Sequence, residues 1–193
     1  MKFGILSDTH GFFHPALAEL FAGVDVIFHA GDIGTSDVLT RLQSIAPTVA
    51  VRGNIDGEAF YDTPRLEHRE YDGMRFTLTH NAGDLIHPIF DMSSRVLAKP
   101  ADILISGHYH AYWCSRLQTE HRTVLWLNPG AAGNAGYHTQ RQALLLTVKP
   151  RSERIGLIAK DCILQKIDLG PRGDDVTSPV LPDQLWQDLH HCN

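Results

Sequence analysis

Seven residues of the kinds that bind metal ions stand at short polar breaks in the first 110 residues of the chain. They are Asp8, His10, Asp32, Asn54, His80, His108 and His110. Carboxylate, amide and imidazole groups are ligands for hard or borderline cations. A single aspartate at such a break is more often a turn former or a helix cap. Turn chemistry has no use for repeated histidine, so the series as a whole predicts a metal centre.

Each polar break follows a short apolar or β-branched run that predicts a strand. The five predicted strands are Lys2–Leu6, Val24–His29, Thr48–Arg52, Arg75–Thr79 and Asp102–Ser106. Apolar residues at helical spacing predict helices at Pro15–Gly23 and Ser36–Ala46. Strands that alternate with helices form largely parallel sheets, whose sites gather beyond the carboxyl ends of the strands. We therefore expect the seven residues to meet at one edge.

The second half of the chain predicts strands with short connections and no helix between them. These strands are Thr123–Leu127, Gln142–Lys149, Arg154–Lys160 and Cys162–Leu169. Antiparallel hairpins suit such connections and imply a second sheet. The expected fold is α/β, with two packed sheets and helices outside them. We expect one domain over residues 1–169, followed by a tail at 170–193 with a short helix at Asp183–His190.

Composition excludes several classes of protein. The net charge of −5 and the scattered lysines and arginines give no basic platform for nucleic acid. No stretch approaches the roughly 18 apolar residues of a membrane span. Cys114, Cys162 and Cys192 contain no CxxC pair and do not make a disulfide framework, which favours a cytoplasmic location. The sequence leaves open whether the chain forms a homo-oligomer.

The polar breaks resemble the five motifs of a known family, in order and in spacing. The matching segments are Asp8-Thr9-His10, Gly31-Asp32, Gly53-Asn54-Ile55-Asp56, His80 and Gly107-His108-Tyr109-His110. They look like the motifs of the calcineurin-like metallophosphoesterases, in particular their small YfcE-like phosphodiesterase branch. The resemblance covers about residues 1–150, including Asn128-Pro129-Gly130. It implies a four-layer αββα sandwich of two mixed sheets and two divalent transition-metal ions, with Mn²⁺ expected first and Fe, Ni²⁺ or Zn²⁺ as alternatives.

The resemblance also implies a role for each ligand. Asp8, His10 and His110 would bind one cation, Asn54, His80 and His108 would bind the other, and Asp32 would bridge both. Catalytic roles are expected for Asp32, Asn54 and His10. Asn54 and Asn81 are expected to contact a small phosphoester substrate. The family usually has glycine where this chain has Asn81, which either binds a phosphate oxygen or holds the turn.

Ile55 departs from the family pattern. Many members have a histidine there, thought to protonate the leaving oxygen, and isoleucine has no proton to donate. The missing acid favours substrates with good leaving groups unless another group donates. Asp56 is expected to be structural, and His29 to be packed rather than a ligand. His14 and His138 lie in polar stretches, where solvated side chains are expected.

A phosphodiesterase is the leading hypothesis for function. A phosphomonoesterase would use the same site, and a monoester would gain more from the missing acid. A protein-interaction scaffold of the same fold is the other alternative, although seven chemically competent ligands argue against it.

Overall fold

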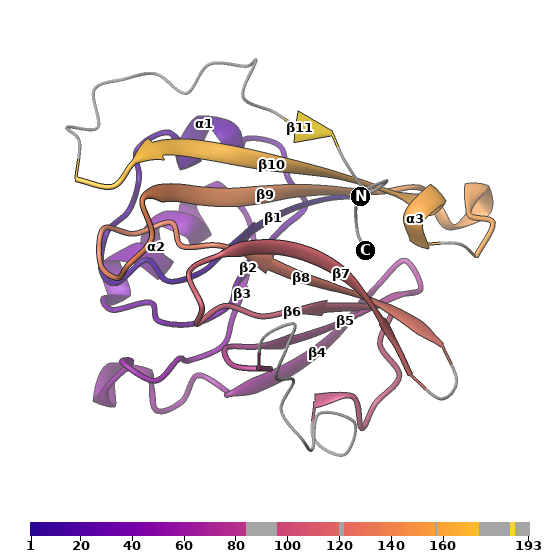
Figure 1. Cartoon of the computed structure of the whole chain (residues 1–193), viewed down its shortest axis with the longest axis horizontal. Coiled ribbons are helices and arrows are strands. Elements are labelled where there is room, and N and C mark those ends of the chain that lie inside the picture. Colours follow the sequence, from indigo (N-terminus) through magenta and orange to yellow (C-terminus); the bar gives the residue numbers. More distant parts are fainter. Residues whose placement is uncertain (84–95, 120–121, 157, 174–185, 188–193) are drawn as a thin grey trace.

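The structure is a computed structural model, and it describes residues 1–83, 96–119, 122–156, 158–173 and 186–187. Two mixed β-sheets pack against each other (Figure 1). The first sheet has the order β11-β10-β9-β1-β2-β3, and the second has the order β4-β5-β6-β8-β7. No helix in these ranges is long and apolar enough to cross a membrane.

The first sheet combines the first three strands of the sequence with the last three, and β1 and β9 are neighbours at its centre. Its strands are β1 (Lys2–Leu6), β2 (Val26–His29), β3 (Thr48–Ala50), β9 (Gln140–Val148), β10 (Cys162–Pro171) and β11 (Trp186–Gln187). β1, β2 and β3 are parallel, so their carboxyl ends reach the same edge. β9 runs antiparallel to β1, and β10 and β11 continue the sheet in antiparallel pairs.

The second sheet has a parallel centre and antiparallel edges. Its strands are β4 (Leu66–Tyr71), β5 (Met74–Thr79), β6 (Ile103–Ile105), β7 (Tyr112–Gln118) and β8 (Thr123–Pro129). β5, β6 and β8 are parallel, while β4 pairs antiparallel with β5 and β7 pairs antiparallel with β8. The carboxyl ends of β5 and β6 are therefore on one side, where their loops can meet those of the first sheet.

An apolar core fills the space between the sheets. Phe3 and Phe28 come from the first sheet and Phe76 from the second, and all three are buried. The ring centroid of Phe76 lies 4.8 Å from that of Phe3 and 5.0 Å from that of Phe28. Aromatic contacts at these distances add to the stabilisation from burial.

Helices cover the outer face of the first sheet. α1 (Leu17–Leu20) and α2 (Ser36–Ile45) belong to a second apolar cluster with sheet residues such as Leu6 and Ile27. Over the second sheet, Val96 and Ala101 pack with Leu104 and Trp126. The α/β sandwich of two mixed sheets is therefore confirmed, and residues 84–95, which precede Val96, lie outside the described residues.

Three sequence-based assignments need correction. The predicted strand at Arg154–Lys160 is wrong, because this stretch contains a turn and the start of α3 (Ile158–Asp161). A 3₁₀ helix, η3 (Arg151–Glu153), precedes the turn, and another, η1 (Glu58–Phe60), lies between β3 and β4. The Asp161 carboxylate accepts hydrogen bonds from the N–H groups of Ile155 and Gly156, both at 2.9 Å, and closes that turn. β4 and β7 were not expected, and the helix expected from residue 15 to residue 23 is limited to α1.

The tail and the cysteines are only partly described. Within the predicted tail helix, residues 186–187 form β11, so a helix there is wrong, and the rest of that segment lies outside the described residues. The division into residues 1–169 and 170–193 stays a prediction. Cys162 is buried and free, whereas Cys114 is disulfide-bonded. Since disulfides are rare in reducing compartments, this bond weakens the cysteine argument for a cytoplasmic location.

Candidate metal centre

The seven predicted ligands lie in loops at the edge where the parallel strands of both sheets end. Loops after β1, β2 and β3 carry Asp8, His10, Asp32 and Asn54, and loops after β5 and β6 carry His80, His108 and His110. The N–H groups of Asp8 and His10 donate to the carbonyl oxygens of Gly31 and Asp32, each at 3.0 Å. The N–H of His108 donates to Asp8 Oδ2 at 3.1 Å and links the two sheets.

Four of the side chains form a first cluster. The ligand atoms of Asp8, His10, Asp32 and His110 all lie within 4.8 Å of one another. His110 Nε2 is 3.2 Å from His10 Nε2 and 3.2 Å from Asp8 Oδ1. Asp8 Oδ1 is buried and accepts no hydrogen bond from the described residues. A cation would satisfy this orphaned oxygen and the facing imidazole nitrogens together, so the donor set fits a metal ion.

A second cluster forms around the Asn54 amide oxygen. Asn54 Oδ1 lies 2.9 Å from His80 Nε2 and 3.0 Å from His108 Nδ1. His80 Nδ1 is 2.8 Å from the Ala30 carbonyl oxygen, which only accepts hydrogen bonds, so Nδ1 carries a proton. In the neutral ring, His80 Nε2 then presents a lone pair to another acceptor. A cation between these atoms would resolve the conflict.

A proton can take the place of that cation. Burial lowers the pKa of His80, but hydrogen bonding to Asp32 and the negative charges of Asp8 and Asp32 outweigh it and raise the pKa above its ordinary value. The extra proton on His80 Nε2 would face Asn54 Oδ1 and Asp32 Oδ1, the latter at 3.3 Å. Metal binding at this position would therefore displace a proton.

Asp32 lies between the two clusters. Its Oδ1 is 3.3 Å from His80 Nε2, and its Oδ2 is 3.9 Å from His10 Nε2. Burial raises the pKa of Asp32, but the hydrogen bond and charge of His80, the Ile55 N–H and the charge of His10 lower it to about 2. An ionised carboxylate with one oxygen toward each cluster has the arrangement that a bridging ligand needs.

Unusual backbone conformations hold five of the seven predicted ligands. Asp8, His10, Asp32, His108 and His110 all have φ between 48° and 75°, in the left-handed region. Non-glycine residues seldom adopt it, and such residues cluster at functional sites. Among the other described non-glycine residues, only a turn aspartate shares this feature.

Close backbone approach explains two glycines at the site. A Cβ atom on Gly53 would lie 2.0 Å from Asp32 Oδ1. A Cβ atom on Gly107 would lie 1.9 Å from Ser7 Oγ and 2.8 Å from Asp8 Oδ2. Both distances are too short for any side chain, so glycine lets the loops press against the carboxylates.

Two further buried groups support the ligand loops, as expected from the sequence. Asp56 accepts hydrogen bonds from the N–H groups of Gly34 at 2.9 Å and Gly53 at 2.7 Å, and so links two loops. His29 is fully buried, with Nδ1 accepting from the Gly31 N–H and Nε2 2.9 Å from Thr9 Oγ1. Burial lowers the pKa of His29 to about 4, so its ring is neutral near pH 7.

His138 contacts a predicted ligand, His110, although no pattern in the sequence pointed to it. His138 Nε2 lies 3.0 Å from the Gly133 carbonyl oxygen and must carry the proton there. Its Nδ1 is then an acceptor, 3.3 Å from His110 Nδ1. His110 therefore donates from Nδ1 and presents the lone pair of Nε2 to the first cluster. His138 thus sets the tautomer that a metal ligand requires.

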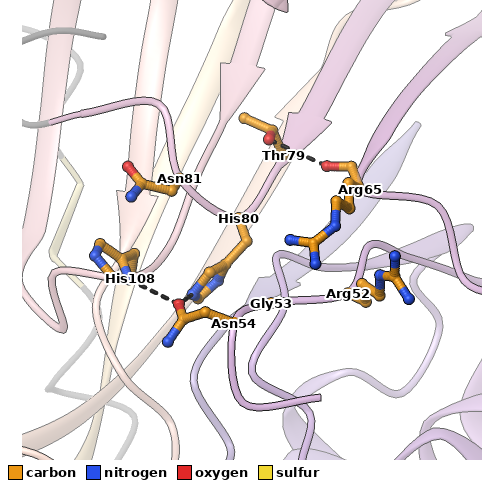
Figure 2. Close-up of a pocket in the computed structure, with 8 residues that line it drawn as sticks. All are labelled: Arg52, Gly53, Asn54, Arg65, Thr79, His80, Asn81 and His108. Carbon is orange, nitrogen blue, oxygen red and sulfur yellow. Dashed lines mark hydrogen bonds between the residues drawn. The ribbon is translucent and has the colours of Figure 1, made fainter. Parts of the chain in front are cut away.

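The structure also shows the environment of Asn81 and of His14. Asn81 Oδ1 accepts a hydrogen bond from the Gly83 N–H at 2.9 Å, so this oxygen holds the turn. The Asn81 side chain still lines a pocket beside the second cluster (Figure 2). His14 is 2% exposed, so the expectation of a solvated side chain is wrong there.

Comparisons with known proteins point to one family. Residues 1–151 match the calcineurin-like phosphoesterase superfamily domain. A probable metallophosphoesterase of Methanocaldococcus jannaschii is 36% identical over 139 residues, which cover 68% of this chain and 68% of that protein.

Solved structures share the fold. A conserved uncharacterized protein of Streptococcus pneumoniae TIGR4, a predicted phosphoesterase, has a TM-score of 0.62 at 20% identity, with 97% of this chain and 96% of that chain covered. Wild-type Vps29 from Entamoeba histolytica, complexed with Zn²⁺, has a TM-score of 0.67 at 20% identity over 88% and 93% of the two chains. The sequence match and the shared fold together place this chain in the calcineurin-like phosphoesterase superfamily.

Proposed function

We propose that the protein is a metal-dependent phosphodiesterase that hydrolyses a small phosphodiester with the help of two divalent transition-metal ions. One observation carries the proposal: two groups of lone-pair atoms converge on separate points, and the two oxygens of Asp32 face one group each. Mixed oxygen and nitrogen ligands suit a catalytic centre with open positions rather than a closed structural site.

Two bound cations would lower the pKa of a water molecule between them and neutralise the phosphoryl oxygens during in-line attack. The residues of the chain supply the rest of the chemistry. Asp32 fixes the relative positions of the two clusters, and Asn54 offers its amide NH₂ group to a phosphate oxygen while Oδ1 faces the second cluster. His10 lies in the first cluster, where its imidazole would help to hold the first cation.

A diester is preferred over a monoester because of the residue after Asn54. The Ile55 side chain is 47% exposed beside the site, while its N–H donates to Asp32 Oδ1 at 3.1 Å. An isoleucine side chain cannot protonate a departing oxygen. A monoester, with its additional negative charge, depends more on that proton than a diester does.

A metal-reconstituted assay tests the proposal. Bis(p-nitrophenyl) phosphate and p-nitrophenyl phosphate have the same leaving group, so the ratio of their kcat/KM values compares diester with monoester chemistry. We expect the diester to be the better substrate with Mn²⁺ and about two metal ions per chain in elemental analysis. A higher kcat/KM for the monoester would overturn the diester assignment.

A protein-interaction role is the second candidate, supported by the fold that this chain shares with Vps29, a vacuolar protein sorting protein. Absence of metal uptake, together with absence of hydrolysis of both esters, would favour that role. Mn²⁺ is our first expectation for the metal, and loading with Fe, Ni²⁺ or Zn²⁺ in parallel tests the alternatives.

A further inference from the structure

A pocket of about 310 Å³ opens beside the second cluster and is not explained by metal binding alone. It is lined by Arg52, Gly53, Asn54, Arg65, Thr79, His80, Asn81 and His108 (Figure 2). Three of these residues are the proposed ligands of the second cation. The pocket therefore leads away from the reacting centre on that side, and two arginines stand farther along it.

Both arginines are anchored to the loops that carry the ligands. Arg52 precedes Asn54 by two residues, and its N–H donates to the Pro64 carbonyl oxygen at 2.9 Å. The carbonyl oxygen of Arg65 accepts a hydrogen bond from Thr79 Oγ1 at 3.1 Å, immediately before His80 in the sequence. The positions of both arginines relative to the second cluster are thus set by the backbone of the site.

The two guanidinium groups have no anionic partner among the described residues. The arginine ion pairs that do form in these ranges, such as Arg75 with Asp102, join residues outside the pocket. Arg52 Nε is buried and makes no hydrogen bond within the same part of the chain. In a protein with a net charge of −5, two arginines that share a pocket and have no ionic partner in the described ranges indicate a site for an anion.

The Arg52 side chain is also held in place. Its guanidinium carbon lies 5.3 Å from the ring centroid of Tyr61, in a cation–π contact. Stacking on a ring fixes the plane of the guanidinium group but leaves its N–H donors available at the edge. A planar fork of donors is the geometry that binds phosphate oxygens in pairs.

We propose that Arg52 and Arg65 bind a second phosphate of the substrate, next to the phosphodiester that is hydrolysed. The inference rests on the proposed phosphodiesterase function and narrows the substrate class to phosphodiesters with another phosphate group nearby. A substrate of this class would place its scissile phosphate at the two clusters and its second phosphate between the arginines.

Two esters that differ by one group test the proposal. Thymidine 5′-(p-nitrophenyl phosphate) has one phosphate, and its 3′-phosphorylated form has the same scissile bond and leaving group with a second phosphate. With the Mn²⁺-loaded protein, we expect the second phosphate to raise kcat/KM roughly 10- to 100-fold, the range of one or two charge-assisted hydrogen bonds. Arg52→Gln and Arg65→Gln should each bring that ratio closer to one.

Arg69→Gln is the matched control. Arg69 is exposed, as Arg65 is, but it is on β4, pairs with Glu67 and lies outside the pocket. This variant should keep the ratio of the unmodified protein. A ratio near one in the unmodified protein, or a ratio that neither pocket variant lowers, would overturn the proposal.

A binding measurement separates failure of this inference from failure of the proposed function. Calorimetry with thymidine 5′-phosphate and thymidine 3′,5′-bisphosphate on the Mn²⁺-loaded protein requires no hydrolysis. Tighter binding of the bisphosphate that is lost in Arg52→Gln/Arg65→Gln supports the arginine site even if neither ester is cleaved. Equal binding of both nucleotides by a protein that cleaves the single-phosphate ester refutes the arginine site alone.

Discussion

Replacing His138 with phenylalanine tests whether a residue that touches no metal ion sets the metal affinity of the first cluster. Phenylalanine keeps a flat ring of similar size but removes both nitrogens. It therefore deletes the acceptor 3.3 Å from His110 Nδ1 and the donor to the Gly133 carbonyl oxygen. Without these contacts, His110 can rotate or place its proton on Nε2, the nitrogen that faces the cluster.

The expected loss of metal affinity follows from the hydrogen-bond acceptor that His110 would lose. Hydrogen bonds that orient metal-binding histidines are worth about 10- to 100-fold in metal affinity, or about 1.4–2.7 kcal/mol. His110 is central to the first cluster, because its Nε2 lies 3.2 Å from both His10 Nε2 and Asp8 Oδ1. Weakening should therefore appear in one class of metal sites, and the sites around Asn54 should keep their affinity.

Calorimetric titration of Mn²⁺ into the metal-free protein measures both classes. His138→Asn is expected to retain part of the affinity, because its amide oxygen can still accept the His110 proton. His68→Phe is the control, since His68 binds Thr77 Oγ1 at 3.0 Å on β4, away from the clusters. Unchanged Mn²⁺ affinity in a folded His138→Phe protein would refute the tautomer argument.

Three further predictions concern the bridging ligand, the missing acid and stability in acid. Asp32→Ala should abolish hydrolysis, while circular dichroism should show that the fold is retained. Asn54→Ala should lose activity that excess metal partly restores. Equal and full activity in both variants would contradict the assignment. Because Ile55 cannot act as a general acid, which typically contributes about 10²–10⁴-fold, rates across aryl phosphodiesters should fall steeply as leaving-group pKa rises, and Ile55→His should flatten that dependence. A flat series in the unmodified protein would show that another group donates the proton. For His14, burial and then the positive charge of Arg141 lower the pKa from 6.5 to about 4. The unfolded chain thus binds more protons than the folded protein between these values, so the free energy of unfolding should fall as pH drops from 6.5 to 4, by at most about 3 kcal/mol from this residue. Urea unfolding over that range should show a smaller fall for His14→Asn, and an identical fall would exclude the contribution.

The convergence of the seven side chains was predictable because strand ends obey a simple rule. A short apolar run followed by a polar break marks the carboxyl end of a parallel strand, and five such ends meet at one edge. The directions of the side chains were not predictable in this way. His108 and His110 are two residues apart, which on a strand would aim them alike, yet their left-handed loop sends them to different clusters.

The missed strands have a physical reason as well. β4 and β7 are the two edge strands of the second sheet. Edge strands carry charged and polar side chains that prevent pairing with other chains, and this weakens the apolar signal. Glu67, His68 and Arg69 in β4 illustrate the point. His138 was missed for another reason, since contacts between distant loops leave no periodicity in the sequence.

The spacing between the two sheets has a consequence for which metal ion binds. Each cluster takes side chains from loops of both sheets, so in the proposed metal centre the distance between the layers would affect the length of each coordination bond. The aromatic contacts of Phe76 with Phe3 and Phe28 help to set that distance, because they belong to a core between the sheets and protein cores are packed as densely as organic crystals. Metal sites accept deviations of only about 0.2 Å in ligand distance. We therefore expect discrimination between cations of different radius to depend partly on phenylalanines that contact no cation.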